Sequence, residues 1–256
     1  MPRRLAATIS ALAAVASCQF SAVDAIATPV DPSTTTTVSP VDTTSPITTT
    51  TSPPTTSLAP TTTLPILTAR DVKVVSRVNT RDKVVFITID DGFSPTSELA
   101  EVIRRHRVPI TTFAMPRLVR RNEDWFLARK SMTFENHTVT HGSLTRRSLR
   151  VQKQEICRAN DQIEKITGQR PTLFRPPGGN FTAKTKKALA HCGIKYLVMW
   201  SGMAEKNELN IRGGRLSRGD IILMHYIPSA ASTLELLIAQ MKRDGLRPAL
   251  LRDYLD

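Results

Sequence analysis

The feature that most constrains this sequence is an apolar run that stops abruptly at two carboxylates, in the stretch Lys83 to Phe93 (K-V-V-F-I-T-I-D-D-G-F). From Val84 to Asp90, six of the seven residues favour strands and five are apolar, which is typical of a buried strand in a parallel sheet. Carboxylates at the carboxyl end of such a strand lie where α/β enzymes place their active sites. Asp-Gly is also a common turn pair, so other parts of the chain have to decide between the two readings.

Apolar segments suited to strands alternate with amphipathic segments suited to helices along the chain. The further expected strands are Val108 to Met115, Met132 to Phe134, Thr172 to Phe174, Tyr196 to Trp200 and Ile221 to Met224. The expected helices are one opened by Ser94-Pro95-Thr96, then Asn122 to Lys130, Ser148 to Thr167, Thr182 to His191 and Ser232 to Asp244. Alternation at this short spacing predicts an α/β fold with a parallel sheet, in the form of an irregular barrel.

The first 68 residues differ in composition from the rest. Residues 1–18 have the outline of a secretion signal: a basic start, then an apolar segment too short to span a membrane. Val15-Ala16-Ser17-Cys18 resembles the bacterial lipobox, in which the cysteine is lipidated, but an ordinary cleaved signal with a chance cysteine is the alternative. Residues 28–64 contain 16 Thr, 5 Ser and 7 Pro and have no periodic apolar face, so we predict a disordered linker over 19–68.

These features predict export of one monomeric domain, residues 69–256, either secreted or anchored to the outer face of a bacterial membrane through Cys18. The domain holds 33 of the 35 basic and 19 of the 22 acidic side chains, a formal charge of +14. That charge suits an anionic cell-wall polymer, although a merely solvated basic surface is an equal alternative. No aromatic-interleaved basic motif indicates nucleic acid, so we expect no such partner. Cys157 and Cys192 either form a disulfide or are buried thiols.

Two histidines follow the short expected strand that ends at Phe134, in the motif His137-Thr138-Val139-Thr140-His141. At i and i+4 on a helical turn, the two imidazoles would share one face at a separation that suits one metal ion. H-x-x-x-H alone is weak evidence. With a strand-end Asp it makes a three-ligand set that leaves positions open for water and substrate, which is typical of catalytic metal sites.

Two more segments place polar groups at strand ends. Residues 174–180 (F-R-P-P-G-G-N) contain two prolines and two glycines, which fix a tight loop, and Arg175 could hold a carboxylate with its fork of donors. His225 directly follows an apolar strand. The plain alternatives are a strand-to-helix loop and a packed core histidine.

Together, T-I-D-D-G (88–92), H-T-V-T-H (137–141), R-P-P-G-G (175–179) and L-M-H (223–225) resemble, in this order and spacing, the polysaccharide deacetylase family. This is the NodB homology domain, or carbohydrate esterase family 4, and the resemblance covers about residues 83–256. It implies a distorted (β/α) barrel. It also implies a metal-dependent hydrolase that removes N-acetyl groups from N-acetylglucosamine in peptidoglycan or chitin-like oligomers.

The resemblance also implies roles for individual residues at the metal. Asp91, His137 and His141 would bind a divalent metal, commonly zinc, with cobalt or nickel as alternatives. Asp90 would be the general base that acts on water. Arg175 would pair with Asp90 and keep it ionised and oriented.

Four further positions are implied to meet the substrate. His225 would be the general acid for the leaving amine, and Leu223 would line the pocket for the acetyl methyl group. Pro177 and Gly178 belong to the loop whose backbone N–H could stabilise the oxyanion, a contribution of roughly 3 kcal/mol by analogy with other oxyanion holes.

The sequence departs from the family pattern at two places. Gly178 stands where the family usually has an aromatic residue, so a sugar-facing ring is lost. The Asp-x-x-Asp-Trp motif expected after the strand ending at Trp200 is absent, and with it the aspartate that supports the catalytic histidine; Glu205 or Glu208 could substitute. A weakly active or inactive wall-binding module is therefore an alternative function, as is O-deacetylation of xylan or another acetylated glycan.

Overall fold

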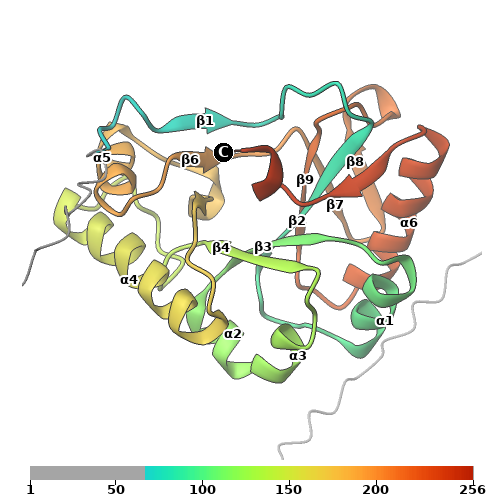
Figure 1. The fold of residues 1–256 in the computed structure, drawn as a ribbon, viewed down its shortest axis with the longest axis horizontal. Helices are drawn as coiled ribbons and strands as arrows, with labels where there is room; N and C mark the ends of the chain where they lie inside the picture. The colour runs from blue at the N-terminus through green and yellow to red at the C-terminus, as the bar shows by residue number, and fades with distance from the viewer. Residues whose placement is uncertain (1–66, 256) are drawn as a thin grey trace, which may run out of the picture. The chain divides into compact units, whose positions relative to one another are not determined.

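The computed structural model describes residues 67–255, which form the ribbon in Figure 1. The expected signal sequence, the lipobox at Cys18 and the expected linker up to residue 66 lie outside the described residues. Leu67, the first described residue, lies partly buried against the core. Within the described part of the chain, no helix is long and apolar enough to cross a membrane.

The described strands join into one ten-stranded sheet with the order β1-β6-β5-β4-β3-β2-β9-β7-β8, and β10 pairs with the start of β2. All these pairs are parallel except the antiparallel hairpin β7–β8. The strands are β1 Lys73–Val75, β2 Val84–Asp91, β3 Ile110–Ala114, β4 Met132–Asn136, β5 Leu173–Phe174, β6 Tyr196–Val198, β7 Gly202–Glu205, β8 Glu208–Ile211, β9 Ile221–His225 and β10 Arg247–Ala249.

The helices lie around this sheet, with α4 and α5 over one end and α1 and α6 over the other (Figure 1). They are α1 Ser97–His106, α2 Pro116–Arg121, α3 Glu123–Leu127, α4 Leu149–Thr167, α5 Ala183–His191 and α6 Ala230–Arg243. Short 3-10 turns cover Pro177–Gly179, Arg212–Gly214 and Arg252–Tyr254. The sheet is a curled, open half-barrel, which confirms the distorted, incomplete barrel expected from the sequence.

The central strand β2 is buried on both faces, and its side chains alternate between two cores. Val85, Ile87 and Ile89 pack with the helices α1 and α6, whereas Val84 and Phe86 pack inside the curl. Period-two alternation places the next residues on the inner face, Thr88 and Asp90, above that inner core. The apolar run therefore ends by presenting a carboxylate at the carboxyl edge of the half-barrel.

The hairpin β7–β8 and the strands β1 and β10 were not predicted, and the start of α1 was placed too early. Thr96 caps α1 by accepting a hydrogen bond from the Leu99 N–H, so Pro95 lies before the helix instead of in its first turn. The hairpin turns through Lys206 and Asn207, which both have positive φ, 52° and 63°. Two consecutive residues with positive φ form the type of two-residue turn that matches the twist of a β-hairpin. In sequences this turn is usually recognised by a glycine, which Lys206-Asn207 lacks.

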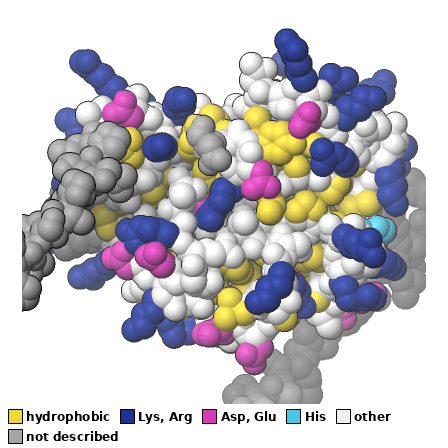
Figure 2. All heavy atoms as spheres, viewed as in Figure 1, with side chains coloured by type: hydrophobic (Ala, Val, Ile, Leu, Met, Phe, Trp, Pro, Cys, Tyr) yellow, Lys and Arg dark blue, Asp and Glu magenta, His cyan; other side chains and the backbone are white. Residues whose placement is uncertain are grey.

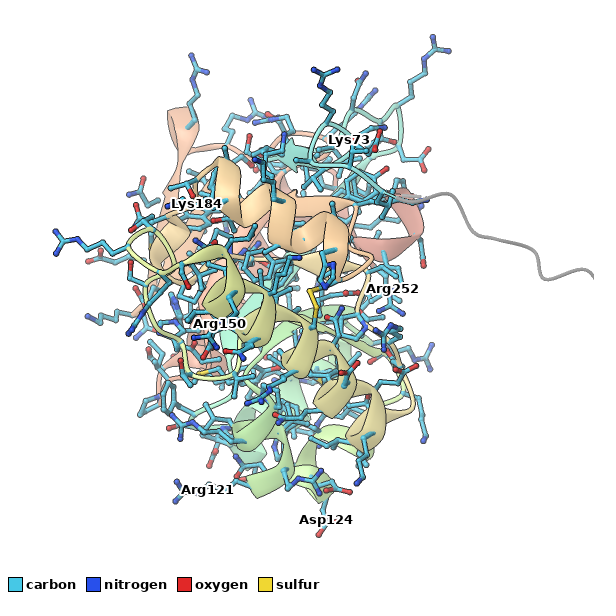
Figure 3. The ribbon with its side chains drawn as sticks, turned by 90° about the vertical axis from the view of Figure 1, so that its left-hand side faces the viewer. Lys73, Arg121, Asp124, Arg150, Lys184 and Arg252 are labelled. Atoms are coloured by element: carbon cyan, nitrogen blue, oxygen red, sulfur yellow. A yellow bond between two sulfur atoms is a disulfide. The ribbon has the colours of Figure 1, made fainter. Side chains whose placement is uncertain are left out.

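Cys157 and Cys192 form a disulfide that links α4 to the end of α5, which decides between the two alternatives left by the sequence (Figure 3). The cysteines are 35 residues apart in sequence. Closing a loop of that length stabilises the fold by about 4 kcal/mol in the chain-entropy model.

The basic charge does not gather into one patch on the face shown in Figure 2. Lys and Arg side chains are spread over that face and are interspersed with acidic ones. A specific anion site therefore has to be located from local geometry and not from the net charge.

Candidate active site

The carboxyl ends of the central strands surround a cleft of about 280 Å³. It is lined by Asp90, Asp91, His137, His141, Pro176, Gly178, Gly179, Trp200, Met203, Leu223 and His225. The structure thus brings seven of the nine predicted site residues to one surface. Of the other two, Arg175 is fully buried behind Asp90 and Pro177 is buried in its loop.

The end of β2 turns sharply so that two consecutive carboxylates face the same cleft. Asp91 has a φ of 77° and Gly92 a φ of 107°, both in the left-handed region. A β-carbon at Gly92 would lie 3.3 Å from Leu118 Cβ and from a Phe126 ring carbon, so this position favours glycine for space as well as for φ.

The two histidines come together, but not on a helical turn as the sequence suggested. His137 directly follows β4, and the segment up to His141 is a loop in which Thr138 and His141 have φ values of 67° and 61°. The ring centroids of His137 and His141 are still only 4.9 Å apart.

The conformation of this loop is fixed by hydrogen bonds to side chains and not by the backbone hydrogen bonds of a helix. Asn136 Oδ1 accepts from the Thr138 N–H, and Glu155 Oε2 on α4 accepts from the N–H groups of Val139 and Thr140. Sequence reasoning missed Glu155, because a charged residue on an amphipathic helix carries no signal of its contact with a distant loop.

Asp91, His137 and His141 form the one group of three or more metal-ligating side chains found among residues 67–255. Their ligand atoms all lie within 4.8 Å of one another. Asp91 Oδ1 is 3.3 Å from His141 Nε2 and 3.6 Å from His137 Nε2. The set of two imidazoles and one carboxylate suits zinc and related divalent ions.

Two further observations show that these residues fit a cation. His137 Nδ1 lies 2.7 Å from the backbone carbonyl of Arg175, which places the ring proton on Nδ1 and leaves the Nε2 lone pair free. Burial lowers the pKa of His137, so the ring is neutral at neutral pH. Asp91 Oδ1 is buried and has no hydrogen-bond donor among the described residues, a deficit that a bound cation would relieve.

Asp90 is held by a buried arginine. Arg175 Nη1 donates to Asp90 Oδ1 at 2.7 Å and to Thr88 Oγ1 at 2.8 Å. The guanidinium also donates to two backbone carbonyls in residues 198–199 and stacks on the ring of Phe113 at 4.1 Å. Burial lowers the pKa of Arg175, and the neighbouring Asp90 carboxylate opposes that shift.

His225 faces the same cleft from β9, where it is the direct neighbour of Asp90 in the sheet. Its Nδ1 lies 3.1 Å from Glu205 Oε1, and both side chains are about 30% exposed. The two atoms are close but not aligned as a hydrogen bond, and Nδ1 has no other partner in the described chain. Of the two glutamates named from the sequence, the structure places Glu205 beside His225, whereas Glu208 is exposed on β8.

Comparison with known proteins agrees with this geometry. A family model described as polysaccharide deacetylase matches residues 77–197. An uncharacterized protein of Streptomyces coelicolor is 34% identical over 192 residues, which are 71% of this chain and 77% of that protein. The chain belongs to the polysaccharide deacetylase family.

Another relative is the peptidoglycan-N-acetylmuramic acid deacetylase PdaA of Bacillus subtilis, 27% identical over 188 residues, 65% of this chain and 69% of PdaA. The solved structure of PdaA superposes with a TM-score of 0.60 over 71% of this chain and 84% of its own. A Bacillus anthracis protein described as a pseudoenzyme of carbohydrate esterase family 4 has a similar fold, with 22% identity, a TM-score of 0.61 and coverage of 72% and 69%. The activity must therefore be argued from the residues in the cleft.

The family match ends at residue 197, before the side of the cleft that holds His225. That side also carries Trp200 and Met203, which line the cleft and were not among the predicted site residues. Met203 pairs with Leu223 in the sheet, so the two apolar side chains are neighbours. Strand β7, which carries Met203, was not predicted from the sequence, and the contribution of Met203 to the cleft was missed with it.

Proposed function

We propose that this protein is a metal-dependent hydrolase that removes N-acetyl groups from N-acetylglucosamine in peptidoglycan or chitin-like oligomers. One observation carries the proposal: a carboxylate paired with a buried arginine, a histidine and a group of three metal-ligating side chains share one cleft. The printed functions of the relatives support a polysaccharide substrate.

Asp91, His137 and His141 would hold the divalent cation, with zinc as the first candidate and cobalt or nickel as alternatives. When bound, the cation would polarise both the attacking water and the acetamide carbonyl.

Asp90 would take the proton from the attacking water. Its Oδ1 is engaged by Arg175, while Oδ2 lies 3.8 Å from His137 Nε2 and faces the ligand cluster. Arg175 would hold this carboxylate in a fixed orientation, because the guanidinium is itself hydrogen-bonded on several sides. Water oxygen adds to the carbonyl carbon, and the charge that develops on the carbonyl oxygen needs a donor.

Gly178 is the candidate backbone donor in the 177–179 loop. Pro177 has no N–H, and the Gly179 N–H is already donated to the Pro176 carbonyl at 2.9 Å. A φ of 63° at Gly178 is one that glycine adopts without strain.

His225 would protonate the amine nitrogen as the C–N bond breaks, which releases acetate and a free amino sugar. Glu205 lies where it can orient the His225 ring and stabilise its protonated form. Leu223 and Met203 would pack around the acetyl methyl group, because they are the apolar side chains of the cleft on the His225 strand and its neighbour.

The proposal extends to location and assembly. We propose an exported monomer without nucleic-acid partners, with membrane contact only through lipid at Cys18. The disulfide supports export, because such bonds persist mainly in oxidising compartments.

The test is acetate release by the full-length protein with added zinc or cobalt. N-acetylglucosamine oligomers, peptidoglycan and acetylated xylan would be compared, with Asp90→Asn beside each. Release from a glycan amide that disappears in Asp90→Asn supports the proposal. Release from xylan alone indicates an O-deacetylase.

The second candidate function is a weakly active or inactive wall-binding module. The imperfect alignment between His225 and Glu205 favours it. Metal binding and glycan binding without acetate release from any of the three substrates would establish it.

A further inference from the structure

The loop that carries two of the candidate cation ligands, residues 137–141, has a strained backbone. Thr138 has a φ of 67° and His141 a φ of 61°, in the left-handed region that residues with a β-carbon rarely adopt. Such a conformation persists where the surrounding structure holds it. The contacts that hold the loop therefore decide where its two imidazoles lie.

The start of the loop is held by Asn136, whose amide is oriented by α4. Asn136 Nδ2 donates to the Ile156 carbonyl at 2.8 Å and to Asn160 Oδ1 at 2.6 Å, and both acceptors belong to α4. With both amide hydrogens donated to the helix, Asn136 Oδ1 faces the loop and accepts from the Thr138 N–H at 2.9 Å. Asn136 and Asn160 are fully buried, so these polar groups depend on one another for their hydrogen bonds.

The middle of the loop is held by Glu155, from the same part of α4. Its Oε2 accepts from the Val139 N–H at 3.1 Å and from the Thr140 N–H at 2.9 Å. The end of the loop is closed by a contact within the loop, because Thr138 Oγ1 accepts from the His141 N–H at 3.0 Å. Side chains thus accept all four N–H groups that follow the first histidine, and three of these hydrogen bonds depend on α4.

A disulfide fixes this part of α4. Cys157 lies between Glu155 and Asn160 in the helix and is bonded to Cys192, directly after α5 (Figure 3). Asn160 Nδ2 also donates to the Cys192 carbonyl at 3.2 Å. A covalent bond and a buried hydrogen bond therefore join residues 155–160 to the same neighbouring residue, which makes this stretch of helix a fixed support for the loop.

We propose that residues 155–160 of α4 position His137 and His141 for the divalent cation, and that the disulfide Cys157–Cys192 holds this support in place. The inference rests on the proposed function, in which the two histidines are cation ligands. No side chain of residues 155–160 is among the described residues that line the cleft, so the effect passes through the loop. A loop that is fixed before the cation arrives loses less freedom on binding, so it binds the cation more tightly.

The test measures cation affinity and loop dynamics separately. The full-length protein is purified without reductant and stripped with a chelator, and its zinc Kd is measured by competition with a chromogenic chelator. Hydrogen exchange at the Val139 and Thr140 amides, measured by NMR in the metal-free protein, reports on the two hydrogen bonds to Glu155 without any cation. Urea unfolding of each variant shows whether the fold itself is weakened.

Two substitutions at Glu155 are compared: Glu155→Ala removes the acceptor, and Glu155→Gln keeps one acceptor oxygen. The matched control is Glu164→Ala, because Glu164 is also a partly exposed glutamate of α4 but its carboxylate pairs with Arg170. A double variant, Cys157→Ser with Cys192→Ser, removes the disulfide. Serine is chosen because reduced cysteines would themselves bind zinc.

Glu155→Ala should weaken zinc binding about tenfold, which lies within the range for outer partners of metal ligands, and should speed exchange of both amides. Glu155→Gln should recover part of both losses, and Glu164→Ala should stay within about twofold of the native protein. The serine variant should weaken zinc binding several-fold while it remains folded.

Native zinc Kd and native amide exchange in Glu155→Ala would overturn the positioning role, as would an equal loss of affinity in Glu164→Ala. A serine variant with lower stability but native zinc Kd would show that the disulfide stabilises the fold and does not serve the cation site.

This inference and the proposed function can fail separately. If the native protein binds zinc and releases no acetate, but Glu155→Ala still weakens zinc binding, the positioning role stands and the hydrolytic function falls. If acetate release depends on zinc and Glu155→Ala changes neither Kd nor amide exchange, the function stands and the positioning role falls.

Discussion

Two carboxylates flank the cleft, and each is paired with a basic side chain, but the two pairs differ in rigidity. Asp90 and Arg175 are both buried, and Arg175 Nη1 lies 2.7 Å from Asp90 Oδ1. Asp90 lies near the end of the central strand β2. The side chains of Glu205 and His225 are about 30% exposed, and Glu205 Oε1 lies 3.1 Å from His225 Nδ1 without the alignment of a hydrogen bond. The difference indicates that the Asp90 side of the cleft is held rigidly, whereas the His225 side is held more loosely.

The hairpin explains why the second pair is looser. Glu205 is the last residue of β7, at the tip of a hairpin on the edge of the sheet. Near its turn the hairpin is tied to α6, where the Asn207 N–H donates to Thr233 Oγ1 and Ser232 Oγ donates to Asn207 Oδ1. Among the described strands, the outer strand β8 has no second strand partner, so the hairpin is held on fewer sides than β2, which is buried on both faces.

The largest expected effect is at Arg175. Arg175→Gln should abolish measurable acetate release and lower the free energy of unfolding by about 3–5 kcal/mol, because it leaves a buried carboxylate without its partner. Urea unfolding followed by circular dichroism measures the second quantity. A stable and active Arg175→Gln protein would contradict the rigid pairing.

Asp90→Asn removes the proposed base but keeps the shape of the side chain. We expect kcat to fall about 10³–10⁴-fold, near the upper limit for loss of a general base, while zinc binding is retained. Single-turnover acetate release and a zinc-binding titration separate these effects. If kcat falls less than tenfold, Asp90 is not the base.

His225→Gln should lower kcat on amide substrates about 10²–10³-fold, with little change in KM. On an aryl acetate, whose leaving group departs without a proton, the loss should be much smaller. An equal loss on both substrates would show that His225 supports the cleft and does not donate a proton.

Glu205→Gln should lower kcat on amides about tenfold, which corresponds to about 1.4 kcal/mol, and should have almost no effect on the aryl acetate. Glu205→Asp should recover part of the loss. The matched control is Glu208→Gln, the residue directly across the hairpin, which we expect to stay within about twofold of the native protein. If Glu208→Gln loses as much as Glu205→Gln, hairpin stability is the cause and not the pairing with His225.

The two sides of the cleft also differ in how far sequence could predict them. The Asp90 side could be predicted because a strand that is buried on both faces consists of consecutive apolar residues. The two carboxylates that follow Ile89 interrupt this pattern and therefore stand out in the sequence. The separation of His137 and His141 was also predictable, although their loop is not helical. Its true conformation depends on hydrogen bonds from Asn136 and Glu155, which no local pattern encodes.

On the His225 side of the cleft, the sequence predicted His225 itself but not the hairpin that lies beside it. The hairpin β7–β8 turns through Lys206 and Asn207 without glycine, so neither strand was expected, and the choice between Glu205 and Glu208 could not be made from spacing. The proximity of Glu205 to His225 follows from the assembled fold and not from any single element.

The most direct test of the central claim is the metal dependence of acetate release by the full-length protein. The protein would be stripped with a chelator, assayed on peptidoglycan glycan strands, and assayed again after one equivalent of zinc. The chemistry proposed for Asp91, His137 and His141 predicts no release from the stripped protein and recovery with zinc, but no recovery in an Asp91→Ala, His137→Ala double variant that remains folded. Undiminished acetate release by the stripped protein would contradict it.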